Sequence, residues 1–122
     1  MKNSIIGQLA HSLGRRDEIP NILLAERIAD REDKIAIKEL VALTKHKSIA
    51  IKYDAIKVLY EVGARKPELI NRYCDVFLTM LGHKDNRVQW GSMTTLSVIS
   101  GSSPELLADH IIPIVDAMDH GS

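Results

Sequence analysis

Apolar residues recur along the chain with the spacing of one face of an α-helix. Over residues 49–64 they follow the i, i+4, i+8, i+11 pattern of a single stripe: Ile51, Ala55, Leu59 and Val62. A second amphipathic stretch covers roughly 67–82 and begins at Pro67, where a missing N–H costs a helix nothing. No segment sustains the alternation of a β-strand, so the pattern predicts an all-α fold.

The same pattern returns after 37 residues. Residues 49–85 align with 86–122 without a gap, and the identical pairs are Leu59/Leu96, Pro67/Pro104, Glu68/Glu105, Leu69/Leu106 and His83/His120. A more diverged copy lies at 12–48. We therefore expect one domain, 1–122, with a leading segment 1–11, three two-helix units and about seven helices. A 37-residue repeat is typical of a solenoid, whose units bury their apolar faces only against neighbours.

The stretches "FLTMLGHKDNRVQWGSMTTLSVI" and "IIPIVDAMDHGS" resemble HEAT repeats. The positions that match the family pattern are Pro113 for the proline, Asp85 for the turn aspartate, Val88 for the valine, and Gly91 and Ser92 for the small pair. In the middle unit the corresponding residues are Ile51, Lys52, Asp54 and Ala55, and Ser48 stands in the place of the turn aspartate. The resemblance implies a right-handed α-α superhelix of the HEAT/armadillo-like solenoid type. It also implies that the second helices of the units form a concave, partner-binding surface.

Composition narrows the function classes. The 122 residues carry 16 basic and 16 acidic side chains, so there is no global field that would attract nucleic acid or an anionic membrane. The N-terminal apolar stretch is too short and interrupted for a signal peptide or membrane span. A single cysteine cannot form an internal disulfide, which favours a reducing compartment. We expect a cytoplasmic protein.

Three of the five histidines, His46, His83 and His120, are spaced 37 residues apart. Equivalent positions on stacked repeats lie roughly 8–10 Å apart, whereas zinc needs imidazole nitrogens at about 2.0–2.1 Å. We therefore expect no metal site. Each histidine follows the end of a first helix, where a partly charged imidazole could bond the last free carbonyl groups.

No catalytic signature is present in the sequence: HExxH, a cysteine pair, a Gly-rich phosphate loop and GxSxG are all missing. Cys74 falls at a core position of a first helix, where a buried thiol is an ordinary occupant. The sequence therefore predicts a protein that is not an enzyme and has no cofactor.

A ladder of large side chains lies off the core stripe, at the same position of each second helix: Arg16, Tyr53 and Trp90. Four further residues could support it: Lys52, Lys57, Tyr60 and Met93. Aromatic side chains of this kind are effective at interfaces. Two interpretations stay open, because Tyr53 and Trp90 could bind a ligand or could pack in the groove between repeats.

The leading functional hypothesis is a protein-interaction or scaffold module that binds a peptide or partner helix on this ladder. The alternative is nucleic-acid binding, in resemblance to HEAT-like DNA glycosylases, because residues 45–66 hold six basic side chains against Asp54 and Glu61. The last helix, 104–119, has more apolar residues than one stripe needs. This surplus predicts self-association through that helix, or a natural chain that continues past Ser122.

Overall fold

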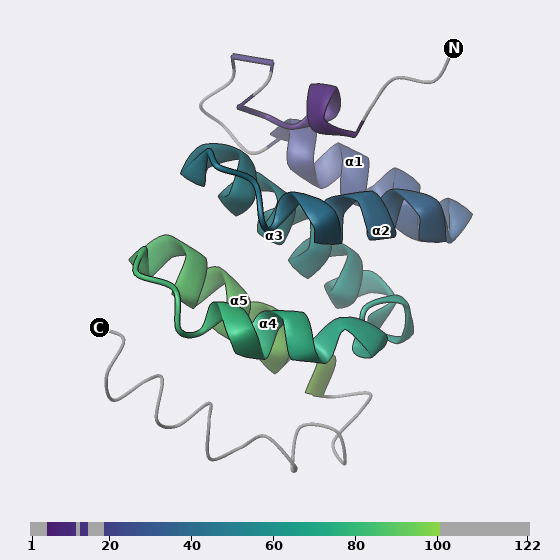
Figure 1. The fold of residues 1–122 in the computed structure, drawn as a ribbon. Coiled ribbons are helices and arrows are strands. Elements are labelled where there is room, and N and C mark those ends of the chain that lie inside the picture. Colours follow the sequence, from purple (N-terminus) through teal and green to yellow (C-terminus); the bar gives the residue numbers. More distant parts are fainter. Residues whose placement is uncertain (1–4, 12, 15–18, 101–122) are drawn as a thin grey trace.

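The computed structural model of the protein describes residues 5–11, 13–14 and 19–100. These residues form five α-helices and three short 3-10 helices, with no strand among them (Figure 1), as the spacing of apolar residues predicts. In chain order the elements are η1 (Ile6–Gln8), α1 (Ile19–Arg31), α2 (Lys34–Leu43), α3 (Ile49–Arg65), η2 (Pro67–Leu69), η3 (Asn71–Tyr73), α4 (Cys74–Met80) and α5 (Asn86–Ser100).

Three of the α-helices, α2, α3 and α5, begin at side chains that cap their free N–H groups. Asp33 Oδ1 accepts from the backbone N–H of Ala36 at 3.1 Å before α2, and Ser48 Oγ accepts from Ile51 at 3.3 Å before α3. Asp85 Oδ1 accepts from Val88 at 3.2 Å at the start of α5. Since serine and aspartate serve equally well as N-caps, Ser48 has the same local role at the start of α3 that Asp85 has at the start of α5.

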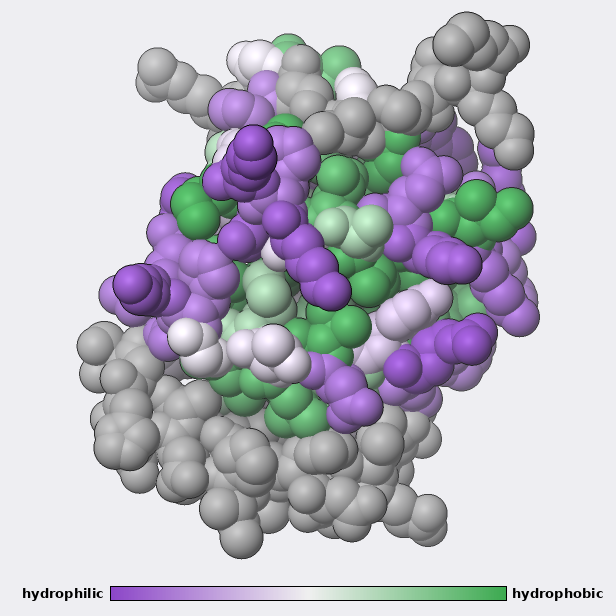
Figure 2. Space-filling model, viewed as in Figure 1, coloured by the Kyte–Doolittle hydropathy of each residue, from purple (hydrophilic) through white to green (hydrophobic). Residues whose placement is uncertain are grey.

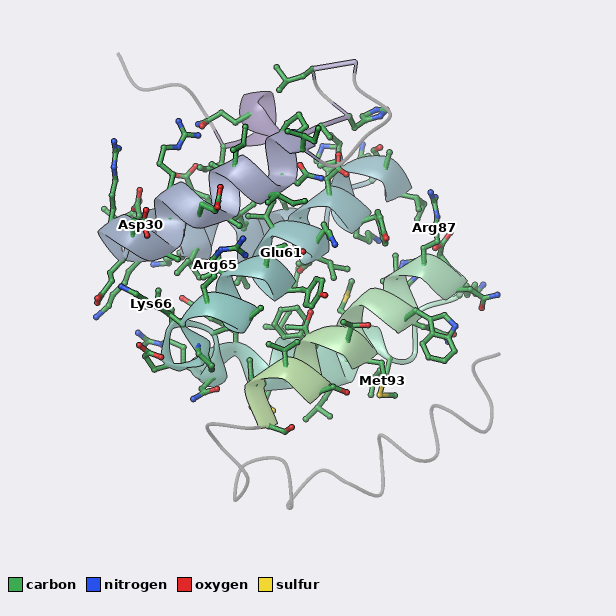
Figure 3. The ribbon with its side chains drawn as sticks, turned by 180° about the vertical axis from the view of Figure 1, so that it is seen from behind. Asp30, Glu61, Arg65, Lys66, Arg87 and Met93 are labelled. Carbon is green, nitrogen blue, oxygen red and sulfur yellow. The ribbon has the colours of Figure 1, made fainter. Side chains whose placement is uncertain are left out.

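The helices form two layers. In Figure 1, α2 and α4 lie toward the viewer, and the reverse view of Figure 3 shows α1, α3 and α5 following one another along the opposite side. The middle helix, α3, packs against α1, α2 and α5, and α4 packs against α5. The arrangement therefore places α3 and α5 side by side, where they share a surface.

The predicted stripes form the core. All four residues of the α3 stripe are buried, as are their α5 counterparts: Val88, Ser92, Leu96 and Ile99. Phe77 of α4 is fully buried in the same cluster, and Cys74 is buried beside it, as the sequence predicts. On the face of α2 and α4, some apolar side chains show between hydrophilic ones (Figure 2). The core consists of one large, mainly aliphatic cluster with contributions from every α-helix and a small second cluster of Ile56, Met80 and Val88.

The prediction of one helix over 67–82 is wrong in its first part. The chain there forms two 3-10 turns, in which the N–H of Ile70 bonds Pro67 O at 3.0 Å and that of Tyr73 bonds Ile70 O at 2.8 Å. The α-helical segment begins only at Cys74. Asn71 begins the second turn, and asparagine is a weak helix former. The preceding helix also runs one residue beyond its predicted end and stops at Arg65, despite Gly63.

Several expectations concern residues outside the described ranges. They include Arg16 of the ladder, His120, the helix 104–119 with its proposed self-association, and the part of the unit 86–122 beyond Ser100. The expected total of about seven helices includes the helix 104–119, so the described residues do not test this total.

Candidate partner-binding groove

The two neighbouring helices α3 and α5 approach closely at a glycine. A Cβ atom at Gly91 would lie 2.8 Å from Cγ2 of Ile56, which is closer than side chains pack. Ile56 is fully buried, so its methyl group has little room to move away. Gly91 therefore allows the backbone of α5 to lie against α3. Larger side chains on both helices border a groove over this contact.

The groove has a volume of about 380 Å³ and runs between the outer faces of α3 and α5. Its lining residues follow helical spacing on both sides: Tyr53, Ile56, Lys57 and Tyr60 on α3, and Asn86, Arg87, Trp90, Gly91 and Thr94 on α5. Among the described residues the lining is part apolar and part cationic, and none of these side chains is a carboxylate. We call this feature the α3/α5 groove.

Four of the seven predicted site residues meet in the α3/α5 groove: Tyr53, Lys57, Tyr60 and Trp90. Trp90 is 56% exposed although it is the largest side chain of α5, whereas Tyr53 and Tyr60 are half-buried. Packing inside the core is therefore not the role of Trp90. For Tyr53 both interpretations, packing between helices and ligand binding, remain open, because its ring is half-buried and also lines the groove.

The remaining three predicted residues do not line the groove. Met93 is half-buried and packs against the central core cluster. Lys52 points to the next turn, where its Nζ lies 2.9 Å from Nε2 of His83. Arg16 lies outside the described residues. Figure 3 shows Met93 and Arg87 on the same helix.

Sequence reasoning missed Arg87 and Asn86, although both lie within one turn of Trp90 on α5. Positions three and four residues apart share a helix face, so the spacing from Trp90 could have identified them. The Arg87 guanidinium lies 5.6 Å from the centre of the Tyr53 ring, and Nζ of Lys57 lies 4.7 Å from that of Tyr60. Each tyrosine thus has a cation over its face.

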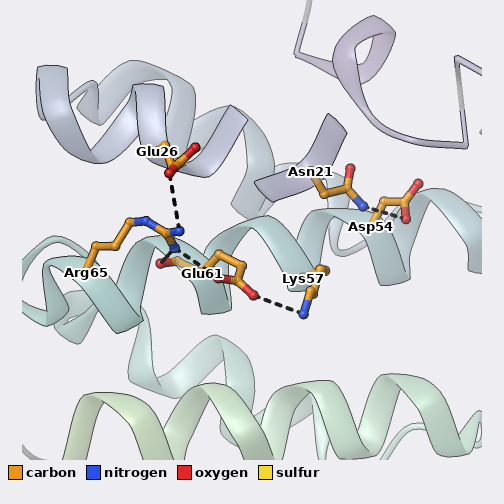
Figure 4. A network of polar contacts seen from close by, with 6 residues as sticks. All are labelled: Asn21, Glu26, Asp54, Lys57, Glu61 and Arg65. Atoms are coloured by element: carbon orange, nitrogen blue, oxygen red, sulfur yellow. Dashed lines mark hydrogen bonds and ion pairs between the residues drawn. The ribbon is translucent and has the colours of Figure 1, made fainter. Parts of the chain in front are cut away.

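A small ion network borders the groove on α3 (Figure 4). Glu61 pairs with Lys57 at 3.0 Å and with Arg65 at 2.9 Å, and Arg65 also reaches Glu26 of α1 at 3.9 Å. Burial alone would raise the pKa of Glu61. The hydrogen bonds and positive charges of Arg65 and Lys57 outweigh burial and lower the pKa below its usual value. Glu61 is therefore held as a carboxylate that fixes Lys57 at the groove edge.

His46 and His83 have a different role from the expected one. In both turns, Nδ1 accepts the backbone N–H of the residue two positions on: Ser48 for His46 and Asp85 for His83, each at 3.0 Å. An accepting nitrogen carries no proton. The imidazoles thus hold the N-cap residue of the following helix, instead of donating to the carbonyls of the preceding one.

The contact between Lys52 and His83 depends on which ring nitrogen of His83 carries the proton. An ammonium group only donates, so Nε2 accepts from Lys52 only when the ring proton is on Nδ1. In that tautomer Nδ1 cannot accept from Asp85. The two contacts of the His83 ring with Lys52 and Asp85 are therefore alternatives.

Asp54 is a buried carboxylate that the resemblance had placed at a small-residue position. Its Oδ2 accepts from the backbone N–H of His11 at 2.8 Å, and its Oδ1 accepts from Nδ2 of Asn21 at 3.0 Å (Figure 4). Oδ1 of Asn21 accepts in turn from the backbone N–H of Ala10 at 2.9 Å. This network joins the N-terminal segment to α1 and α3, away from the lining of the groove.

Other chemistry finds little support in the described part of the chain. Burial, and then the charge of Asp75, raise the pKa of the Cys74 thiol, so it is a poor nucleophile. Within residues 5–11, 13–14 and 19–100, no three His, Cys, Asp or Glu side chains gather as a metal site would require. No helix in those ranges combines the length and apolar character that a bilayer span requires.

Comparison with known proteins gives no relationship to interpret: no family model, curated protein or solved structure matches the chain.

Proposed function

We propose that the chain is a HEAT-like helical repeat that binds a peptide or a partner helix in the α3/α5 groove, without catalysis of its own. The spacing of the elements supports the repeat: α3 and α5 begin 37 residues apart, at Ile49 and Asn86, and α2 at 34–43 corresponds to η3 and α4 at 71–80. A two-layer arrangement is what a solenoid would require, and in this proposal α1, α3 and α5 are its second helices.

The exposure of Trp90 carries the proposal. Tryptophan is the residue type that most often dominates the affinity of interfaces, because a rigid ring contributes a large contact area with little loss of entropy. Here it stands 56% exposed beside two half-buried tyrosines and an apolar floor at Ile56. None of the described residues that line the groove carries a thiol, imidazole or carboxylate that could act on a bound molecule. Such a surface is suited to binding.

Trp90 also provides the test, because it is the only tryptophan in the chain and its fluorescence reports on the groove directly. Peptides are selected from a displayed random library, and those without tryptophan are titrated while Trp90 emission is recorded. Affinities of Trp90→Ala are measured by calorimetry. We expect this variant to lose more than about 30-fold in affinity, which corresponds to about 2 kcal/mol, while its melting temperature stays near that of the wild type.

Ile35→Ala is the matched control, because Ile35 is 66% exposed on α2 and lies outside the groove. It should bind like the wild type. If Trp90→Ala instead lowers the melting temperature and peptide binding survives, Trp90 is a structural residue and the proposal fails.

Nucleic-acid binding is the second candidate, and one observation favours it. Three aromatic rings and two cations, Lys57 and Arg87, share one groove, which would allow base stacking together with phosphate contact. Salt separates the two candidates. Affinity for a labelled single-stranded oligonucleotide should fall steeply between low and moderate salt if phosphates are bound, whereas a mainly apolar peptide site should change little.

Self-association through 104–119 remains a separate proposal. Sedimentation at micromolar concentration tests it, and a strict monomer would exclude it.

A further inference from the structure

Among the described residues that line the groove, Arg87 is the cation whose terminal hydrogen-bond donors remain available. Its side chain is 61% exposed, and its Nε lies 3.7 Å from Oδ1 of Asp85. That oxygen already accepts from two backbone N–H groups, of Arg87 at 2.9 Å and of Val88 at 3.2 Å. Within residues 19–100 the terminal Nη groups of Arg87 have no acceptor. The guanidinium lies 5.6 Å from the centre of the Tyr53 ring, and Arg87 lines the groove, so a ligand in the groove can reach these Nη groups.

The charges around the groove restrict what can occupy it. A cationic ligand is disfavoured, because Tyr53 and Tyr60 already carry Arg87 and Lys57 over their rings. A polyanion is disfavoured as well, because Lys57 is held by Glu61 at 3.0 Å and the Glu61 carboxylate would repel a second phosphate. One carboxylate is the charge that the groove accommodates, and the fork of a guanidinium matches its two oxygens.

The dimensions favour a short peptide segment. The lining of α5 extends from Asn86 to Thr94, a rise of about 12 Å along a helix, which is the length of about four extended residues. Within that length Arg87 is followed by Trp90, and Ile56 and Gly91 form an apolar floor. A partner therefore needs an acidic residue close to an apolar one.

We propose that the α3/α5 groove binds an acidic linear segment of a partner protein, in which an Asp or Glu carboxylate pairs with the Arg87 guanidinium and a neighbouring apolar or aromatic side chain packs on Trp90. This inference rests on the proposed function, because it specifies the partner of the same groove.

The test is a selection of peptides from a displayed random library on the 122-residue protein, followed by titration of synthetic selected peptides. We expect enrichment of sequences with Asp or Glu within about four residues of an apolar side chain. Arg87→Gln should weaken these peptides at least ~10-fold, the range of a charge-assisted pair, and replacing the peptide's acid by its amide should cause a similar loss.

Arg72→Gln is the control, because Arg72 stands over the Tyr73 ring at 5.8 Å in the same kind of pair but outside the groove. It should leave affinity within about twofold, a change well below one charged hydrogen bond. Circular dichroism of both variants verifies that they fold.

Each outcome has a distinct meaning. Peptides that depend on Trp90 but lack an acid, or that bind Arg87→Gln unchanged, would overturn this inference and leave the proposed function standing. Selection that yields no Trp90-dependent peptide would overturn both. Tighter binding of a 12-nucleotide deoxythymidine strand than of any selected peptide, lost steeply with salt, would assign the groove to nucleic acid.

Discussion

Replacing Gly63 and Gly91 by alanine inserts the same methyl group into two packed helices, with opposite expected effects. Alanine is favoured over glycine in a helix by about 0.8–1.0 kcal/mol, and this gain applies at both positions. At Gly63 a Cβ atom would meet Cγ2 of Ile99 at 3.4 Å and Cγ1 of Ile70 at 3.6 Å, which is ordinary contact. We therefore expect Gly63→Ala to stabilise the protein by about 1 kcal/mol.

At Gly91 the new Cβ would lie 2.8 Å from Cγ2 of Ile56, well inside the optimal separation of about 3.5–4.0 Å. Ile56 is fully buried, and its β-branched side chain has a stiff χ1 angle, so relief requires the helices to move apart. Overpacking of this kind costs about 1–3 kcal/mol. After the gain in helix propensity, Gly91→Ala should be destabilised by up to about 2 kcal/mol.

Urea denaturation followed by far-UV circular dichroism compares the two variants with the wild type. A double-mutant cycle identifies the cause: in an Ile56→Ala background, which lacks Cγ2, Gly91→Ala should become neutral or stabilising. The reasoning about the α3–α5 contact is refuted if Gly91→Ala proves at least as stable as Gly63→Ala, or if its effect is unchanged by Ile56→Ala.

Three further perturbations test the fold and its charges. Glu32 has a φ of 49° at the end of α1, so Glu32→Gly should raise the urea midpoint by removing about 1 kcal/mol of backbone strain; a lower midpoint would contradict this. Leu59→Ala and Leu96→Ala should each cost about 2–5 kcal/mol in calorimetry, since both are buried, and losses below ~1 kcal/mol at both would contradict the assigned helix faces. The lowered pKa of Glu61 means that the unfolded chain takes up its proton first as the pH falls below 4.5. The stability from this group is therefore present above that pH and lost below it. Urea midpoints from pH 7 to pH 3 should thus fall less in Glu61→Gln than in the wild type, and equal slopes would show that the ion network contributes nothing.

The sequence predicted the helices whose packing follows a strict period. The stripes beginning at Ile51 and Val88 repeat every three or four residues with no competing signal, and both are buried as expected. The stretch 67–82 failed because its first residues make i→i+3 bonds after Pro67, a local preference that the apolar pattern does not contain. Periodicity reports which face is buried, and it does not distinguish a 3-10 turn from the start of an α-helix.

Helical periodicity also explains why only part of the candidate site was predicted. Tyr53 and Trp90 occupy positions 37 residues apart on α3 and α5, and Lys57 and Tyr60 follow Tyr53 on the same helix face, so helical spacing alone was enough to predict these four residues. Lys52 and Met93 are each adjacent in sequence to a residue that lines the groove. Successive residues of an α-helix are rotated by about 100° around its axis. This rotation is enough for Lys52 to contact His83 in a turn and for Met93 to pack against the core. The close approach at Gly91, which gives the groove its shape, depends on the distance between two helices and has no signature within either of them.

The position of Asp54 has a consequence for how the chain opens. In an array whose units contact only their neighbours, the first residues could fray without disturbing the third helix. Here the backbone N–H of His11 donates to the Asp54 carboxylate of α3, and that of Ala10 donates to the Asn21 side-chain amide of α1. Asn21 also donates to Asp54, so the two contacts are linked. If residues 10 and 11 detached, the buried Asp54 carboxylate would lose a hydrogen-bond donor, and a buried charge with unsatisfied hydrogen bonds is costly. The amide hydrogens of Ala10 and His11 should therefore exchange with solvent at the rate at which α1 itself opens, although they lie outside any α-helix.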